Sequence, residues 1–132
     1  MAKETRKTVL IVEKQAKYRQ LLAKQMLFAG LNPLVAITGE GGLRKVTERR
    51  PDLILLELDL SDMDGLEFVA TLRQQPELDR IPIIAMSGIA FMKFPCLMEG
   101  CNAFFKKPIK IIELMAQIRR FLSQERKPTR KL

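Results

Sequence analysis

Four polar side chains stand at the ends of short, mostly apolar runs of the sequence. They are Glu13, Glu57, Ser87 and Lys107, which supply two acids, a hydroxyl and an ammonium. The chain contains no histidine, which removes Ser-His and Cys-His catalysis, histidine-ligated metal sites and any phosphohistidine role. Because the four side chains also include no nucleophile–base pair, we expect a binding site rather than an independent enzyme.

Three other groups of residues carry weaker chemical signals. Cys96 and Cys101 lie five positions apart among apolar residues, which favours buried reduced thiols over a disulfide or a redox pair. Residues 38–42 resemble a phosphate loop but lack the Gly-Lys-Ser/Thr ending, so we expect a flexible connection from a strand to a helix. Asp62 and Asp64 do not form an EF-hand pattern, and Asp64 is predicted to cap the helix that follows.

The elements that would position these side chains alternate between buried strands and amphipathic helices. The pattern predicts an α/β fold, a doubly wound parallel sheet, with its working site outside the carboxyl ends of the strands. The predicted strands are residues 8–12, 34–37, 53–58, 83–86 and 104–106, and the predicted helices are 18–27 with a cap at Gly30, 43–49, 66–74, about 95–99 and 111–122, with Pro128 as the final stop.

Length and charge indicate one domain with basic ends. The 132 residues suit a single domain, which we place at 8–123, with residues 1–7 and 124–132 as flexible basic ends. Most of the net charge of +8 lies in those ends, which favours a solvated tail or linker over a nucleic-acid contact. No apolar run approaches the ~20 residues of a membrane helix, and the polar N-terminus does not fit a secretory signal, so we expect a cytoplasmic protein.

Five ordered motifs give the chain a family resemblance. Residues 9–13, 51–57, 63–65, 83–87 and 107–108 resemble the response-regulator receiver domains of two-component phosphorelay signalling, in order and nearly in spacing. The resemblance covers about residues 8–123 and implies a flavodoxin-like, five-stranded sheet in the order 2-1-3-4-5. In that family an acidic pair holds Mg²⁺, an aspartate accepts a phosphoryl group from a kinase, and a hydroxyl and a lysine hold the phosphate.

Two of these positions depart from the family pattern. Glu57 stands at the phosphoacceptor position, and its extra methylene moves the carboxylate by about 1 Å, enough to impair a reaction that depends on alignment. Lys14 replaces the second acid of the pair that begins with Glu13, and an ammonium cannot ligate Mg²⁺; Asp59 could compensate only in part. We therefore predict no metal, with Mg²⁺ binding lost or weak, and no cofactor, while Ser87 and Lys107 fit their phosphate-contact positions.

We consider two states of such a pocket. In the first, Lys14 replaces the charge of the metal by pairing with Glu13 and Glu57, and Glu57 extends toward Lys107 and Ser87, which locks the domain in one state. In the second, the pocket has simply decayed. Three functions remain open: a pseudo-receiver that binds proteins, a receiver still regulated by phosphate at Glu57, and a nucleic-acid-associated regulator that uses the basic tail.

The resemblance also implies a surface for partners. The fourth helix, fifth strand and fifth helix of the family bind a sensor kinase or a downstream effector, and dimers are possible. Phe104 matches the switch aromatic, and as phenylalanine it should prefer a buried position. The apolar residues of 91–98 either repack over the core, which we favour, or form a partner or dimer patch. Whether an effector domain follows Leu132 is left open.

Overall fold

The sheet has the predicted topology. The structure is a computed structural model that describes residues 6–124. Its parallel strands are β1 (Thr8–Val12), β2 (Asn32–Ala36), β3 (Leu53–Glu57), β4 (Ile83–Ser87) and β5 (Ala103–Lys106), hydrogen-bonded in the order β2-β1-β3-β4-β5. The prediction of a doubly wound sheet in the order 2-1-3-4-5 is therefore confirmed.

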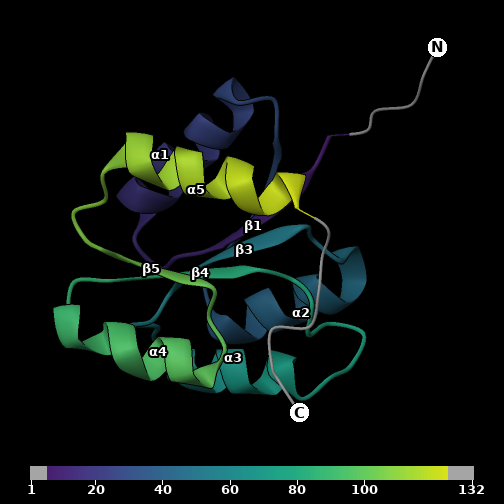
Figure 1. Cartoon of the computed structure of the whole chain (residues 1–132), viewed down its shortest axis with the longest axis vertical. Helices are drawn as coiled ribbons and strands as arrows, with labels where there is room; N and C mark the ends of the chain where they lie inside the picture. The colour runs from purple at the N-terminus through teal and green to yellow at the C-terminus, as the bar shows by residue number, and fades with distance from the viewer. Residues whose placement is uncertain (1–5, 125–132) are drawn as a thin grey trace.

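Two layers of helices cover the sheet. Helices α1 (Ala16–Phe28) and α5 (Ile111–Ser123) lie on one face, and α2 (Gly39–Arg49), α3 (Gly65–Arg73) and α4 (Lys93–Glu99) lie on the other (Figure 1). A 3₁₀ turn, η1 (Ala90–Met92), leads directly into α4. Within residues 6–124, none of the helices is long and apolar enough to span a bilayer.

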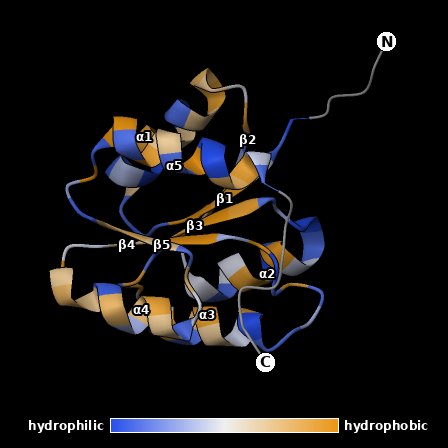
Figure 2. Cartoon of the chain, viewed as in Figure 1, coloured by the Kyte–Doolittle hydropathy of each residue, from blue (hydrophilic) through white to orange (hydrophobic). Residues whose placement is uncertain are grey.

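The strands are buried on both faces because a helical layer lies on each side. Alternate residues of β1 point to opposite faces: Val9 and Ile11 join the core beneath α1 and α5, and Leu10 and Val12 join the core beneath the other helices. All four are fully buried. Figure 2 shows this hydrophobic colouring along the central strands, between the two layers. Such strands read as continuous apolar runs, and this is why the sequence identifies them.

The glycine-rich segment is helical rather than a flexible connection. Helix α2 begins at Gly39, not at residue 43 as predicted. The Thr38 hydroxyl accepts a hydrogen bond from the Gly41 N–H at 3.0 Å, and the Asp62 carboxylate accepts from the Gly39 N–H at 2.8 Å. These contacts satisfy the amides at the start of the helix. A side chain at Gly42 would lie 2.9 Å from Val12 Cγ2, so this glycine permits close packing on β1.

Other boundaries differ by smaller amounts. Strand β2 spans Asn32–Ala36 rather than residues 34–37, so it ends before Ile37, which is exposed. Helix α4 begins at Lys93, which places Pro95 in its first turn, where the missing N–H has no intrahelical partner to lose. Helix α5 ends at Ser123, before Pro128, which lies outside the described residues together with most of the predicted flexible ends.

Candidate functional site

The register of the sheet brings the candidate side chains to one edge. Glu57 pairs with Met86 between β3 and β4, and Ser87 pairs with Lys106 between β4 and β5. Glu13 follows the last residue of β1, and Lys107 follows the last residue of β5. Because parallel strands end at the same edge, four segments distant in sequence meet there.

Lys107 lies at the centre of the site. Its Nζ is 2.7 Å from Glu13 Oε1 and also contacts Glu57 Oε1. Glu13 is completely buried and Glu57 is 4% exposed, so one ammonium neutralises part of the charge of two buried carboxylates. Burial alone would lower the pKa of Lys107, but hydrogen bonds to Glu13 and then to Glu57 outweigh it and raise that pKa. The lysine is therefore held in its charged form.

The backbone fixes the second oxygen of each carboxylate. Glu13 Oε2 accepts a hydrogen bond from the Gln15 N–H at 3.0 Å, and Glu57 Oε2 accepts one from the Asp59 N–H at 2.8 Å. In both cases the donor lies two residues further along the loop that leaves the strand. Each carboxylate therefore has one oxygen on Lys107 and the other on the main chain, which fixes its orientation.

Lys14 has a different partner from the one predicted. Its Nζ lies 3.2 Å from Asp59 Oδ2, and the Asp59 side chain is 77% exposed. The prediction that Lys14 pairs with Glu13 and Glu57 is wrong, because Lys107 occupies both carboxylates. Lys14 and Asp59 form an ion pair at the rim of the site, in a pocket of about 230 Å³ that Glu57, Ser87 and Lys107 also line.

Ser87 lies in the same pocket with its hydroxyl directed elsewhere. The side chain is buried, and its Oγ accepts a hydrogen bond from the Ile89 N–H at 3.0 Å. Glu57 thus extends to Lys107 as predicted, while Ser87 caps the loop after β4. The structure brings Glu13, Glu57 and Lys107 into contact and leaves Lys14, Asp59 and Ser87 around them.

Tyr18, the first residue of the helix predicted over 18–27, is a member of the site that we did not single out from the sequence. The Lys107 ammonium lies over its ring, 4.1 Å from the centroid, an attractive cation–π contact. Tyr18 lies in the first turn of α1, which follows the loop that carries Glu13 and Gln15. It is the single tyrosine of the chain, and its position on the first helix turn after Glu13 is the signal that could have identified it.

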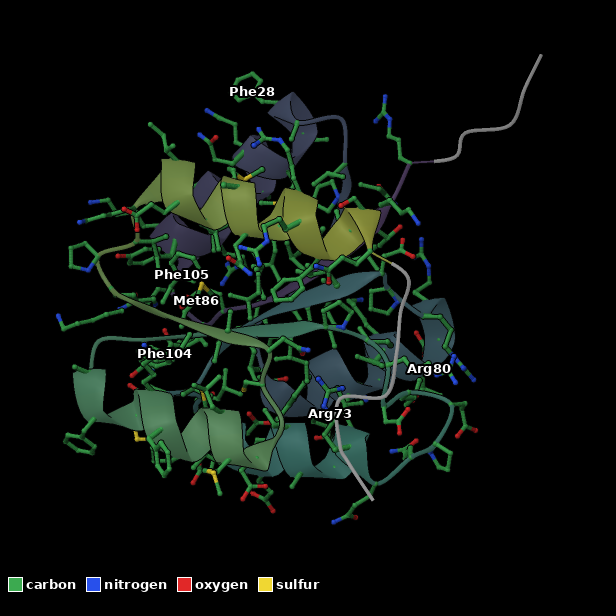
Figure 3. The ribbon with its side chains drawn as sticks, in the orientation of Figure 1. Phe28, Arg73, Arg80, Met86, Phe104 and Phe105 are labelled. Carbon is green, nitrogen blue, oxygen red and sulfur yellow. The ribbon has the colours of Figure 1, made fainter. Side chains whose placement is uncertain are left out.

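Phe104 lies away from the pocket. Phe104 and Phe105 point to opposite faces of the sheet (Figure 3), and Phe104 is half-buried against the core beneath α2, α3 and α4. The prediction that the Phe104 side chain prefers a buried position is therefore only partly met, because the ring is half-exposed.

The apolar residues around α4 do not repack over the core, with the exception of half-buried Met92. Phe91 is 76% exposed and Met98 is 71% exposed. The interpretation that we favoured from the sequence is therefore wrong. Helix α4 turns Cys96 inward and leaves its other large side chains to solvent, because a seven-residue helix on the sheet can bury only one stripe. The exposed group, which we call the α4 patch, comprises Ile89, Phe91, Phe94, Leu97 and Met98.

Comparison with known proteins gives a consistent result. The model of the response regulator receiver domain matches residues 9–119. The KDP operon transcriptional regulatory protein KdpE of Escherichia coli is 36% identical over 113 residues, which is 84% of this chain and 49% of KdpE. The chain thus spans about half the length of that relative. The polar-differentiation response regulator DivK of Brucella anthropi is 30% identical over 118 residues, covering 88% of this chain and 96% of DivK.

Solved structures agree with this similarity. The chemotaxis response regulator CheY4 of Vibrio cholerae superposes with a TM-score of 0.82 at 25% identity, covering 89% of this chain and 99% of CheY4. A two-component response regulator from Clostridium difficile gives a TM-score of 0.83 at 25% identity, covering 90% of this chain and 98% of that one.

Proposed function

The chain belongs to the response regulator receiver domain family of two-component signalling. On that premise we propose that the side chain of Lys107 blocks its phosphorylation pocket and that the chain signals by binding proteins. The observation that carries the proposal is the contact of the Lys107 ammonium with both buried carboxylates, Glu13 and Glu57. An ammonium between two acids supplies the positive charge that a metal ion would otherwise bring to the pocket.

The residues present do not fit a receiver-type Mg²⁺. The metal needs near-octahedral oxygen ligands, but Lys107 and main-chain N–H groups already hold the oxygens of Glu13 and Glu57. Lys14 stands where a second acid would bind, and it pairs with Asp59. Within residues 6–124 no group of three or more His, Cys, Asp or Glu side chains could hold a metal ion.

Order in the pocket favours a locked state over a decayed one. A decayed pocket would leave buried polar atoms without partners, at a cost of about 1–3 kcal/mol each. Among the described residues, buried side-chain nitrogen and oxygen atoms all have a hydrogen-bond partner. Glu57 extends to Lys107 much as a phosphoryl group on a shorter aspartate would, which supports one fixed state that needs no phosphate.

The α4 patch supports a protein partner. Contiguous exposed apolar side chains are uncommon on monomeric proteins and mark interaction sites. The patch belongs to α4 and the turn before it, and α4 is one element of the α4-β5-α5 side through which we propose that the chain meets a sensor kinase or a downstream effector. The basic tail, the basis of a nucleic-acid function, falls mainly outside the described residues, and nothing on the described surface favours that alternative.

The test is a titration of the full chain with Mg²⁺ and beryllofluoride, a phosphoryl mimic, monitored by amide NMR shifts. We expect no saturable change at Glu57, Ser87 and Lys107. Saturable, Mg²⁺-dependent shifts that spread to Phe104 would show that the phosphate switch survives, and would overturn the proposal.

A matched variant makes a negative result informative. The double change Lys14→Asp and Glu57→Asp restores the acid pair and shortens the acceptor, while leaving Ser87 and Lys107 in place. This variant should gain Mg²⁺-dependent beryllofluoride shifts that the native chain lacks. If neither protein responds, the assignment of Lys14 and Glu57 as the cause of the lost response is wrong.

A further inference from the structure

The C-terminus of α4 brings the two cysteines of the chain together. The Cys101 N–H donates to the Cys96 carbonyl at 3.0 Å, and the Gly100 N–H donates to the Leu97 carbonyl at 3.1 Å. This pair of bonds, with Gly100 at a positive φ of 121°, is the Schellman motif. The motif places the side chains of its first and last residues against each other, and here both residues are cysteine.

The two thiols are buried and interact. Cys96 is fully buried and Cys101 is 7% exposed. The Cys101 thiol donates a hydrogen bond to the Cys96 sulfur, which lowers the pKa of Cys96 and raises that of Cys101. Negative charge therefore develops more readily on Cys96, and the thiolate is the form of cysteine that reacts with oxidants.

A buried guanidinium fixes the backbone around this pair. Arg73, from α3, donates to the Gly100 carbonyl at 2.9 Å, to the Ile81 carbonyl at 2.9 Å and to Asn102 Oδ1 at 2.9 Å. Its side chain also lies against Gly100, where an added Cβ would be 2.9 Å from Arg73 Cγ. Figure 3 shows Arg73 within the helical layer that contains α3 and α4. The positive charge of Arg73 opposes the rise in the Cys101 pKa only in part, so that pKa stays raised and Cys101 is the protonated member of the pair.

We propose that Cys96 and Cys101 form a reversible intramolecular disulfide when the chain meets a peroxide. The Cys96 thiolate attacks one oxygen of hydrogen peroxide and the O–O bond breaks, which gives a sulfenic acid and a hydroxide ion. The hydroxide takes up the proton that the Cys96 thiol released on ionising and becomes water. The sulfur of Cys101 then attacks Cys96 Sγ, the S–O bond breaks, and a second water leaves with the remaining thiol proton. The two sulfurs lose two electrons to the peroxide.

The cross-link would act on α4. Disulfides require Cα atoms about 4.4–6.8 Å apart. The main-chain hydrogen bond from Cys101 to Cys96 already holds the backbones of the two residues close together. Closing the S–S bond fixes the C-terminus of a seven-residue helix whose outer side carries Phe94 and Met98. Oxidation would therefore restrain the helix that carries the α4 patch, and it would do so independently of the carboxylate pocket. The inference does not depend on whether the pocket accepts phosphate.

The test uses the full native chain, which contains only these two cysteines. The protein is reduced, freed of reductant and treated with graded hydrogen peroxide, then examined by intact mass, peptide mapping and free-thiol titration under denaturing conditions. We expect both thiols to disappear together, with the loss of two hydrogen atoms from a monomer, and dithiothreitol to restore them. Met98, which is exposed, reports that peroxide reached the protein by gaining oxygen.

Three results would overturn the proposal. The thiols could stay free while Met98 is oxidised, each cysteine could gain oxygen separately, or the disulfide could join two chains. Cys96→Ala and Cys101→Ala are the matched controls, and each should abolish the loss of two hydrogens. If a variant does not fold, hydrogen exchange on the native chain provides a second measurement, since oxidation should slow exchange of the amides of 93–99 and leave those of 65–73 unchanged.

Discussion

Lys107 and Glu57 join two strands that are not neighbours. Glu57 ends β3 and Lys107 follows β5, with β4 between them, yet the Lys107 ammonium contacts Glu57 Oε1. The same ammonium contacts Glu13 after β1. The Lys107 side chain thus links the ends of β1, β3 and β5 at the edge of the sheet where the candidate site lies.

Removing Lys107 should destabilise the fold strongly. In a Lys107→Met variant, two buried carboxylates would face each other without a cation, and breaking a buried ion pair from one side costs about 3–5 kcal/mol. Urea unfolding measures the change. The control is Lys106→Met at an exposed position, which should alter the free energy of unfolding by less than about 0.5 kcal/mol. Equal effects of the two variants would contradict the central role of Lys107.

The same contact predicts a dependence on alkaline pH. The folded state raises the pKa of Lys107 above its usual 10.5, so it binds this proton more tightly than the unfolded chain. The contribution of Lys107 to stability is therefore complete below about pH 10.5 and is lost as the pH rises through the higher folded value. The difference in unfolding free energy between the native chain and Lys107→Met should shrink over that alkaline range. A constant difference would argue against the charged contact.

The rim pair should contribute little. Lys14 and Asp59 are 34% and 77% exposed in their side chains, and exposed ion pairs contribute up to about 1 kcal/mol. A double-mutant cycle with Lys14→Ala and Asp59→Ala should give a coupling energy within that limit that falls further at high salt. A coupling of several kcal/mol would mean that Lys14 acts inside the pocket, as the sequence suggested.

The comparison of Lys14 with Lys107 shows where sequence reasoning stops. The motifs placed both lysines at the carboxyl edge of the sheet, because both follow closely on predicted strands. Which ammonium lies between the acids depends on side-chain direction: Lys107 is directed inward across Tyr18, whereas Lys14 turns to the rim. A spacing pattern carries no information on that direction.

The start of α2 was missed for a related reason. Glycine disfavours helices, so residues 39–42 were predicted as a loop. The Asp62 carboxylate, more than twenty positions away, accepts hydrogen bonds from the N–H groups of Gly39 and Glu40. This tertiary contact outweighs the low helix propensity of the glycines. The exposed α4 patch was the less favoured of two interpretations, because the apolar character of residues 91–98 does not say whether they face the core or solvent.

Gly65 should tolerate no side chain. An added Cβ would lie 2.5 Å from Leu58 Cα and 2.8 Å from the Leu58 carbonyl oxygen, and a backbone cannot move aside as a flexible side chain can. We expect Gly65→Ala to destabilise the chain by about 1–3 kcal/mol in urea unfolding. Gly88→Ala is the matched control, since its Cβ would meet nothing within 4 Å. Equal midpoints for the two variants would show that the loop after β3 can shift.

Truncating the α4 patch should remove binding without affecting the fold. Phe94 is 69% exposed and Phe28 is 78% exposed, but they lie on helices of opposite layers (Figure 1). Phe94→Ala and Phe28→Ala should therefore leave the free energy of unfolding within about 0.5 kcal/mol of the native value. If the patch is the partner surface, Phe94→Ala should weaken capture of partner proteins by the immobilised chain at least about tenfold, as loss of a central aromatic does.

Phe28→Ala should bind as the native chain does, and quantitative mass spectrometry of the captured proteins provides the measurement. The comparison separates a specific surface from general stickiness, because both variants remove the same exposed ring. Equal losses would mean that exposed apolar area alone drives capture, and no loss in Phe94→Ala would place the partner surface elsewhere on the molecule.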